Sequence, residues 1–598
     1  MIDVLSLLNA LIERGVTIEV DGSRVHQRGG PPLSQAAIEQ LSRYAGDLSA
    51  AADASPFPES GSVHGVLATD DLIGFVNSIT SAPLVSVSRV SDAIAVSPDG
   101  HHVEVIAGGS QPEARTKAVG LALELETVGW GANGLSTSRD LSVAVSVLTQ
   151  AGALQGSITT PGDALAAARG EPIGSVPTTD LGRLVYETRA VHDLASIVDR
   201  QVHDLGLGRV VALEERVARI LRQTTEEGVQ VDRQNLEALV AHAEGTFEYH
   251  EARVRHVLGV GINSPELLVR LEVHGCSTAS LKSVDLEPLR EQHAVVDDIL
   301  RARTARGMLT NFGRPWLTAV RTSADGRAHP TFKGNGETGR ISSTSPNVMG
   351  VPRDARARAC IIASEGHSLV EADYSASQLR IVAAYCRVEM LRELFERDAD
   401  LHAWTASKYF RTTPELITAT QRAFGKVANF APLYGAGDDR ILEIARSDYN
   451  AFLHAHEVEE LVHIFFAAFP EIAKWHEVEF ATPTPVAVTP LGRRLWLARP
   501  GTTFNSRLAA PIQAIEADAI KTAIVAAEPE IRARGGRLLS PVNDALLFEI
   551  PDDQVADLVP VLKAAMTEAM IAAMPPPAVP VKVDVKAGKH WGAMRQLE

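Results

Sequence analysis

Four side chains recur at every fourth position in QRAFGKVANFAPLYGAG (residues 421–437): Arg422, Lys426, Phe430 and Tyr434. On an α-helix each step of four residues drifts by only about 40°, so all four would share one broad face. Arginine and lysine suit a triphosphate, and aromatic rings suit a base or a sugar. The row therefore predicts a nucleotide-binding helix. Pro432 predicts that this helix kinks or ends before Tyr434.

Two aspartates are candidate metal ligands. SLVEAD (368–373) is typical of a short strand that ends at Asp373, and residues 375–385 are typical of a helix. RLLSPVNDALLFEIP (537–551) predicts a hairpin with Asp544 at its tip. Each pattern alone favours an ordinary strand end or turn. If both strands belong to one sheet, however, the two carboxylates can hold two Mg²⁺ ions for an in-line displacement at phosphorus.

Seven motifs, in this order, resemble those of DNA polymerase I-type (family A) enzymes. They are GNGETGRISSTSPNVMGVP, EADYSASQLRIVA, DLHAWTA, R-x₃-K-x₂-NF-x₃-YG, TPLGRRLWL, PIQ-x₃-AD-x₂-K and VNDALLFEI. The resemblance runs from about residue 206 to the carboxyl end and includes GINSPELL (261–268) and the closing HW (590–591). One such motif is a weak signal, whereas seven in order are specific. The resemblance implies DNA-templated addition of dNMP from dNTP to a primer 3′-hydroxyl, with primer-template DNA and dNTPs as partners.

The resemblance also implies roles for individual residues. The positions that match its metal site, with two Mg²⁺ ions, are Asp373, Asp544 and Tyr374. Lys426 joins the two aspartates as the third catalytic residue. The positions that match nucleotide contacts are Arg422, Lys426, His402, Phe430, Tyr434, Gln378 and Arg353. Arg340 and Gln513 match positions that touch the minor groove, where contacts to acceptors common to all base pairs check duplex shape.

Several residues depart from the family pattern. Gln378 stands where the family usually has a Glu that blocks the ribose 2′-hydroxyl, so we expect this steric gate in weakened form. A different interpretation is that Ser375 and Gln378 form a capping box. Further departures are Asn543 and Ala545 in place of His and Glu around Asp544, Ala509 in place of Asn, and Asn505 in place of Arg. These changes predict a working but altered active site.

The fold expected is multi-domain α/β, a right-hand polymerase preceded by two smaller domains. The expected boundaries are 1–50 for a small α/β docking-like domain, 51–62 for a linker, 63–205 for an exonuclease-like domain, 206–330 for the thumb, 331–395 and 510–598 for the palm, and 396–509 for the fingers. VTIEV-DG-SRVHQ predicts a hairpin, and PLVSVSRV, AIAVS and VEVIA predict strands. Helices are expected near 2–14, 34–49, 113–127, 139–150 and 180–203.

The exonuclease-like segment lacks the acidic residues that proofreading needs. No Asp-x-Glu occurs in residues 63–205, and Glu124 and Glu126 fall on a predicted helix. Asp140, Tyr186 and Asp193 are remnants of the family pattern. The hypothesis is therefore a degenerate 3′–5′ exonuclease domain of ribonuclease H-like fold, kept as a scaffold. We also expect no 5′-nuclease, a layout that favours a phage or plasmid enzyme by analogy.

Bulk composition limits the remaining classes. The 598 residues carry a net charge of −17, yet basic residues cluster locally, so DNA is neither supported nor excluded. Three cysteines without metal-like spacing favour a reducing cytoplasm, and no apolar run is long enough to span a membrane. We expect a monomer, with a possible protein partner for residues 1–50. The rival functions are a single-subunit RNA polymerase, a template-independent nucleotidyltransferase and a catalytically silent DNA-binding replication scaffold.

Overall fold

The chain folds into two compact units, Met1–Glu215 and Arg216–Glu598, and helix α8 (Gly208–Glu227) contains the boundary between them. The computed structural model describes residues 17–21, 24–29, 63–64, 85–90, 93–97, 103–107, 127–129, 139–154, 161–169, 180–334, 336–449 and 453–597. Within these ranges no helix combines the length and the apolar character needed to cross a bilayer.

The first unit contains one eight-stranded sheet with the order β2-β1-β3-β6-β5-β4-β7-β8. The strands are β1 (Thr17–Asp21), β2 (Arg24–Gly29), β3 (Val63–His64), β4 (Val85–Val90), β5 (Ala93–Ser97), β6 (Val103–Ala107), β7 (Thr127–Gly129) and β8 (Arg139–Asp140). The predicted hairpin is confirmed, because β1 and β2 pair antiparallel and Asp21 pairs with Arg24. Strand β1 also pairs with β3, so this hairpin extends the sheet that holds β4, β5 and β6.

Three helices complete the described part of the first unit: α5 (Leu141–Gln150), α6 (Pro161–Arg169) and α7 (Asp180–Asp204). The helices expected near 139–150 and 180–203 are therefore confirmed. Those expected near 2–14, 34–49 and 113–127, and with them Glu124 and Glu126, lie outside the described residues. The domain boundaries proposed for residues 1–205 stay predictions.

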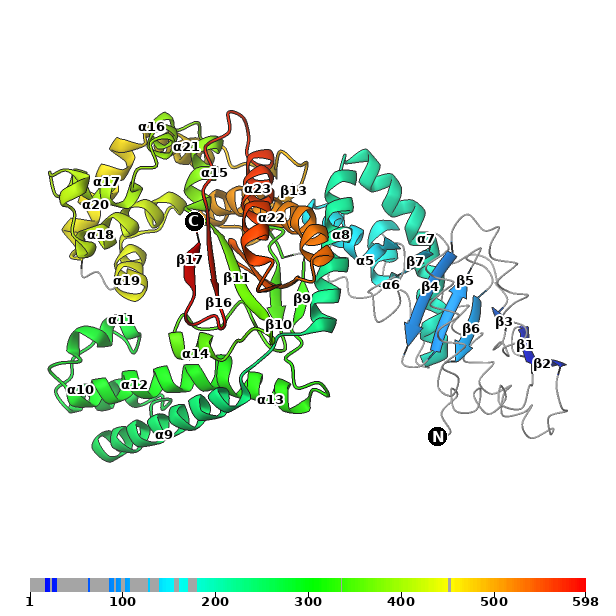
Figure 1. Ribbon diagram of the computed structural model, residues 1–598, viewed down its shortest axis with the longest axis horizontal. Helices are drawn as coiled ribbons and strands as arrows, with labels where there is room; N and C mark the ends of the chain where they lie inside the picture. Colours follow the sequence, from blue (N-terminus) through cyan, green and yellow to red (C-terminus); the bar gives the residue numbers. More distant parts are fainter. Residues whose placement is uncertain are drawn as a thin grey trace. The chain divides into compact units, whose positions relative to one another are not determined.

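The second unit is built on a five-stranded antiparallel sheet with the order β14-β15-β11-β16-β17. Its strands are β11 (His367–Tyr374), β14 (Arg537–Val542), β15 (Ala545–Pro551), β16 (Val583–Gly588) and β17 (Arg595–Leu597). Helices α22 (Phe504–Ala533) and α23 (Val555–Ala573) pack on each other and against this sheet (Figure 1). Side chains alternate between the two faces of a strand, so successive residues of β11 point in opposite directions.

A pair of long helices precedes the sheet. Helix α9 (Arg233–Leu258) lies along α12 (Ala294–Met308), with α10 (Leu267–Val273) and α11 (Ser283–Leu286) at one end (Figure 1). The Asp232 side chain caps α9 by accepting from the amide of Asn235, and Gly259 ends it in a left-handed conformation. Buried apolar residues of α9, α10 and α12 form a core of their own. The segments that join this pair to the sheet are α13 (Arg314–Thr322), β9 (Thr331–Lys333), β10 (Ser342–Thr344) and α14 (Ala355–Ala359).

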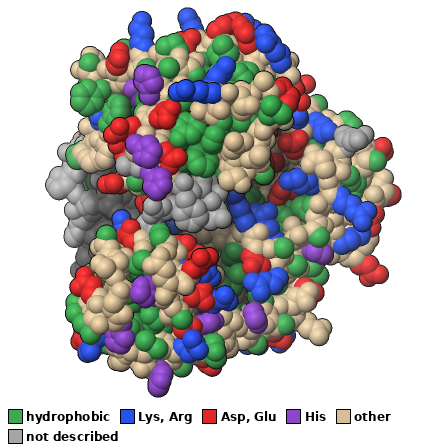
Figure 2. Space-filling model, turned by 90° about the vertical axis from the view of Figure 1, so that its left-hand side faces the viewer, with side chains coloured by type: hydrophobic (Ala, Val, Ile, Leu, Met, Phe, Trp, Pro, Cys, Tyr) green, Lys and Arg blue, Asp and Glu red, His purple; other side chains and the backbone are tan. Residues whose placement is uncertain are grey.

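Between β11 and β14 the chain forms a mainly helical part. Its elements are α15 (Ser377–Tyr385), α16 (Glu389–Glu396), α17 (Leu401–Tyr409), α18 (Ala419–Phe430), η4 (Pro432–Tyr434), α19 (Asp438–Tyr449), α20 (Ala455–Ala468), α21 (Pro470–Ala481), and the hairpin of β12 (Val486–Val488) and β13 (Arg494–Trp496). Figure 2 views the second unit from the side of α17 and α12. The surface between the mainly helical part and the pair of long helices is hollowed, and Lys and Arg side chains gather in the hollow.

Candidate active site

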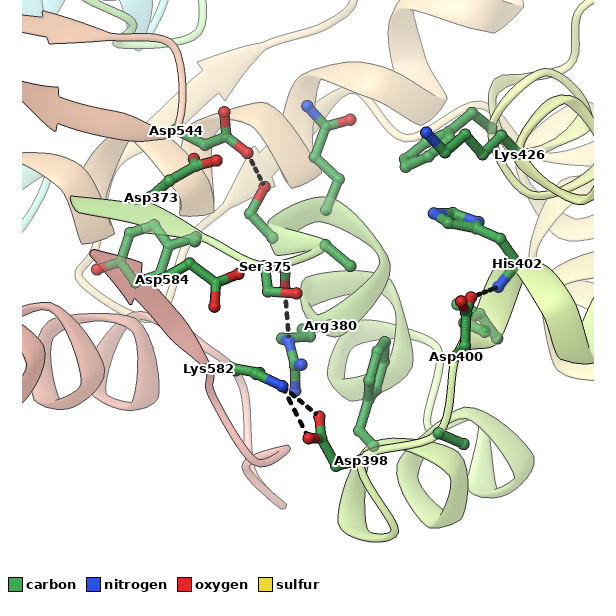
Figure 3. A pocket seen from close by; sticks show the side chains of 18 of the residues that line it. Asp373, Ser375, Arg380, Asp398, Asp400, His402, Lys426, Asp544, Lys582 and Asp584 are labelled. Atoms are coloured by element: carbon green, nitrogen blue, oxygen red, sulfur yellow. Dashed lines mark hydrogen bonds and ion pairs between the residues drawn. The ribbon is translucent and has the colours of Figure 1, made fainter. Parts of the chain in front are cut away.

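A polar pocket of about 740 Å³ opens between the end of the five-stranded sheet and helices α15, α17 and α18. Figure 3 shows carboxylates from the sheet on one side of this pocket, with His402 and Lys426 on the opposite side. Nine of the twelve site residues predicted from the sequence line it, namely Arg353, Asp373, Tyr374, Gln378, His402, Arg422, Lys426, Phe430 and Asp544. Tyr434, Arg340 and Gln513 are not among its lining residues.

Strand pairing brings the two predicted metal-ligating aspartates together. Asp373 ends β11 opposite Ala545, and Asp544 directly precedes Ala545 in the turn between β14 and β15. The strand end and the hairpin predicted for these two residues are therefore confirmed. On its other side Asp373 pairs with Asp584 of β16, which also lines the pocket. The sequence analysis did not single out Asp584, because its nearness to Asp373 depends on the pairing of β16 with β11.

The environment of the two aspartates disfavours two negative charges. Burial, followed by the charge of Asp544, raises the pKa of Asp373 to about 7. Burial and the nearby Glu516 raise the pKa of Asp544 as well. No Lys, Arg or His in the described part of the chain forms an ion pair with either carboxylate. Adjacent half-buried carboxylates that form no ion pair with a cationic side chain fit a hard divalent cation.

Protein carboxylates alone do not complete a metal site here. Within the described ranges, no group of three or more His, Cys, Asp or Glu could hold a metal ion. Mg²⁺ typically uses one or two carboxylates and fills its other positions with water and substrate phosphates. The pocket therefore suits a cation that is bound together with a phosphorylated substrate.

Tyr374 does not direct its side chain towards the aspartates. Because it follows Asp373 on a strand, its ring points to the opposite face of the sheet. There its hydroxyl donates to the main-chain carbonyl of Met566 on α23, at 2.6 Å. Only the main-chain carbonyl of Tyr374 remains for a metal ion at the pocket.

Helix α18 carries the cationic side of the pocket. Thr418 and Gln421 form a capping box that starts the helix, and the helix ends at Phe430, two residues before Pro432. Arg422, Lys426 and Phe430 all face the pocket, as the spacing of four predicts. Tyr434 falls on the short helix η4, so the row of four does not continue on one straight helix.

Two neighbouring helices hold these groups in place. Asp400 accepts from the Arg422 guanidinium at 2.6 Å, and it also caps α17 through the amides of His402 and Ala403. A Cβ atom at Gly425 would lie 1.9 Å from the carbonyl oxygen of His402, so only glycine permits this approach of α18 to α17. The arginine and the histidine therefore have fixed relative positions.

His402 is a neutral donor, not a cation. Burial, helped by the charges of Arg422 and Lys426, lowers the pKa of His402 to about 4. Its Nδ1 lies 3.0 Å from the Asn429 amide nitrogen, which donates to it. The proton therefore resides on Nε2, the atom left to donate to a ligand. Asn429, which also accepts from Thr405 and donates to the Leu401 carbonyl, is a supporting residue that the sequence analysis did not single out.

Gln378 and Tyr434 form one unit. The Tyr434 hydroxyl donates to Gln378 Oε1 at 2.6 Å. The capping-box interpretation of Gln378 is wrong, because α15 begins at Ser377 after Ala376, which has a left-handed backbone and provides no side-chain cap. Phe430 packs against the His402 ring with 5.7 Å between ring centroids.

A buried carboxylate, Glu516, is the largest omission of the sequence analysis. It lies on α22, one turn after Gln513, and is 3% exposed. Its Oε2 accepts from Arg340 at 2.5 Å, and its Oε1 accepts from the Ser377 hydroxyl at 2.7 Å. Arg340, predicted as a DNA contact, is thus held beside the pocket by an ion pair.

Other residues that the sequence analysis passed over close the far end of the pocket. Arg380 is buried, donates to the Ser375 carbonyl at 2.7 Å and lies over the ring of Phe395. Lys582 forms an ion pair with Asp398 at 2.7 Å. Figure 3 shows this ion pair at the side of the pocket away from Asp544.

Known proteins share this architecture and this sequence pattern. DNA polymerase I, thermostable, of Thermus filiformis is 29% identical over 412 residues, which are 64% of this chain and 48% of the relative. DNA polymerase I of Geobacillus stearothermophilus is 30% identical over 410 residues, 63% of this chain and 45% of the relative. The chain spans about half the length of these curated relatives.

One solved structure covers most of the chain. The POL domain of Pol1 from M. smegmatis, in complex with DNA primer-template and dNTP, superposes with a TM-score of 0.76 at 23% identity. The superposition covers 88% of this chain and 99% of that domain. The sequence model of DNA polymerase family A matches residues 222–593, and members of this family use divalent metal ions. Because that match extends over more than half of this chain, the chain belongs to DNA polymerase family A.

Proposed function

We propose that the chain copies a DNA template, adding dNMP from a dNTP to a primer 3′-hydroxyl with release of pyrophosphate. The observation that carries the proposal is the pocket, which sets two half-buried, adjacent carboxylates opposite Arg422, Lys426 and a neutral His402 donor. A triphosphate with Mg²⁺ complements both sides, because the cations of α18 meet the phosphates and the carboxylates meet the metal. The family assignment supports the same reaction.

Each residue has a proposed part in this reaction. Asp373 and Asp544, with the Tyr374 carbonyl, would hold two Mg²⁺ ions, which lower the pKa of the primer hydroxyl and stabilise the leaving pyrophosphate when bound. Arg422 and Lys426 neutralise the triphosphate. The remaining nucleotide contacts are the His402 Nε2–H donor and Arg353 at the phosphates, the ring of Phe430 at the base, and Tyr434 with Gln378 at the sugar. Arg340 and Gln513 would contact the minor groove of the primer-template.

Primer extension tests this proposal directly. The full chain, Mg²⁺ and four dNTPs are incubated with a 5′-labelled primer on templates of two different sequences. We expect extension to the template end, with single-dNTP reactions stopping where each template dictates. Extension that ignores the template would instead indicate a template-independent nucleotidyltransferase. Tight primer-template binding without any extension would support the silent-scaffold alternative.

The proposal includes the absence of proofreading by the first unit. Asp193 is engaged in an ion pair with Arg169 at 2.7 Å, and Asp140 lies on β8. We expect the labelled primer to stay intact in the same assay without dNTPs. Metal-dependent shortening from the 3′ end would contradict a degenerate exonuclease domain.

Two further proposals are a protein partner for residues 1–50 and, from the cysteine content, a cytoplasmic location.

The raised pKa of Asp373 predicts that Mg²⁺ affinity depends on pH. Below its pKa of about 7, Asp373 carries a proton that Mg²⁺ must displace, whereas at higher pH the carboxylate is ionised and available. The half-saturating Mg²⁺ concentration should therefore rise by up to about tenfold for each unit that the pH falls below about 7. This half-saturating concentration is measured by isothermal titration of the full chain with Mg²⁺ in the presence of a non-hydrolysable dNTP analogue.

The sign of the stability effect provides an independent check. A carboxyl whose pKa is raised on folding binds its proton more tightly in the folded chain. The metal-free chain should therefore lose stability at this site as the pH rises through about 7, and added Mg²⁺ should restore it most at the higher pH. Equal Mg²⁺ affinity and equal stabilisation at about pH 6 and about pH 8.5 would contradict an elevated pKa of Asp373.

A further inference from the structure

Glu516 is a charged side chain that folding alone does not explain. Its side chain is 4% exposed, and its one cationic partner in the ion pairs of the described residues is Arg340, whose side chain is 41% exposed. A buried ion pair rarely stabilises more than apolar side chains of similar volume would. The nearby Asp544, whose pKa Glu516 raises, adds to the cost of a negative charge here. The reason for a buried carboxylate at position 516 must therefore lie in the contacts that it makes.

The contacts of Glu516 join four segments at the edge of the pocket. Its Oε2 accepts from Arg340, in the loop before β10, and from Gln378 Nε2 on α15 at 3.4 Å. Its Oε1 accepts from Ser377, whose hydroxyl also lies 3.1 Å from Asp544 Oδ2. Through Gln378 the network reaches the Tyr434 hydroxyl on η4. Glu516 thus contacts Ser377, Gln378 and Arg340. In the proposed function these residues lie beside the metal ions, the sugar and the DNA, respectively.

The two halves of the Gln378 amide are both used. Its oxygen accepts from Tyr434, and its nitrogen donates to Glu516. An amide can do both, whereas the ionised carboxylate of a Glu has no proton to donate. A Glu at position 378 would place a second negative charge against Glu516 Oε2. The amide at 378 and the carboxylate at 516 are therefore complementary, and each explains the other.

We propose that Glu516 is a positioning residue that sets the orientation of Gln378 and Arg340 and thereby controls discrimination against ribonucleotides. This inference rests on the proposed polymerase function. Glu516 touches neither nucleotide nor DNA in this assignment; it acts through Gln378 at the sugar and through Arg340 at the primer-template. Consequently, a Glu introduced at position 378 alone is expected to lower the discrimination against ribonucleotides, not to raise it.

A reciprocal exchange of the two side chains tests this coupling. The ratio of kcat/KM for a dNTP to that for the matching rNTP is measured in wild type, Gln378→Glu, Glu516→Gln and the double variant. Each single variant should lower the ratio by about tenfold, as expected for contacting residues. The double variant keeps one amide and one carboxylate, and its ratio should return to within about threefold of wild type. A matched control is Glu479→Gln, a buried Glu paired with Arg507 and Thr484 away from the pocket, which should leave the ratio unchanged.

Two outcomes would overturn the inference: an unchanged ratio in Glu516→Gln, or a double variant no better than the product of the two single effects. Because the contact exists in the chain without DNA, the same four proteins are also compared by urea unfolding. The unfolding midpoint should fall in each single variant and recover in the exchange. If wild type fails to extend a primer, the proposed function is lost, and the unfolding cycle alone decides whether Gln378 and Glu516 are coupled. Additive midpoints would then refute the positioning role.

Discussion

Asp544→Asn is expected to abolish DNA synthesis while leaving the chain folded. The substitution keeps the size of the side chain and removes one of the two carboxylates that are proposed to hold the metal ions. If both carboxylates hold the metal ions, the loss should reach about 10³-fold or more in kcat/KM, equal to about 4 kcal/mol. Single-nucleotide incorporation under saturating primer-template measures it.

Resistance to urea distinguishes the loss of the metal site in Asp544→Asn from a loss of the fold. Asp373 and Asp544 repel each other, since the charge of Asp544 helps to raise the pKa of Asp373. Without metal, Asp544→Asn should therefore be at least as resistant to urea as wild type. The control is Asp552→Asn, the same chemical change at an exposed residue paired with Lys589, which should extend primers normally. Retained synthesis in Asp544→Asn would refute the metal site at Asp373 and Asp544.

Sequence patterns located most of the pocket because its chemistry is concentrated in a few short elements. Asp373 and Asp544 lie at a strand end and a hairpin turn, and both elements have strong local signals. Arg422, Lys426 and Phe430 share a helix that carries its own capping box and a proline stop. Local propensity and periodicity therefore agree with the tertiary structure at these positions.

The supporting residues could not be found in this way, because their roles come from distant contacts. Glu516 sits in a 30-residue helix, where a single Glu is unremarkable, and its burial depends on Arg340, far away in the chain. The start of α15 was misjudged because Ala376 adopts a left-handed backbone that its residue type does not favour. Tyr374 is different: strand alternation alone predicts that its ring points away from Asp373.

Asp518→Asn is expected to cost about 3–5 kcal/mol of unfolding free energy, because it removes the carboxylate charge from a fully buried ion pair with Arg493. Arg493 and Asp518 have side chains that are 0% and 1% exposed, and they pair at 2.7 Å. Thr489 donates to the second oxygen of Asp518, also at 2.7 Å. The ion pair therefore joins Asp518 of the PIQ-x₃-AD-x₂-K motif, two residues beyond Glu516, to Arg493 of the TPLGRRLWL motif.

Denaturant unfolding followed by tryptophan fluorescence measures this loss. Five of the six tryptophans lie in Arg216–Glu598, so the signal reports mainly on the unit that contains the pair; they are Trp316, Trp404, Trp475, Trp496 and Trp591. Asp552→Asn, which removes an exposed ion pair by the same substitution, should cost only about 0–1 kcal/mol. Similar losses in the two variants would show that burial does not set the contribution of the Arg493–Asp518 pair.

The same pair also supports the turn that carries Arg340. Gly339 has a φ of 79°, and a Cβ atom there would lie 2.8 Å from the Arg493 guanidinium carbon. The buried guanidinium thus lies directly beneath the residue before Arg340, and any shift of Arg493 displaces the partner of Glu516. In Asp518→Asn we therefore expect lowered dNTP/rNTP discrimination even below the unfolding midpoint, at urea concentrations where the fluorescence is still native. Native discrimination combined with reduced stability would instead confine Asp518 and Arg493 to a purely structural role.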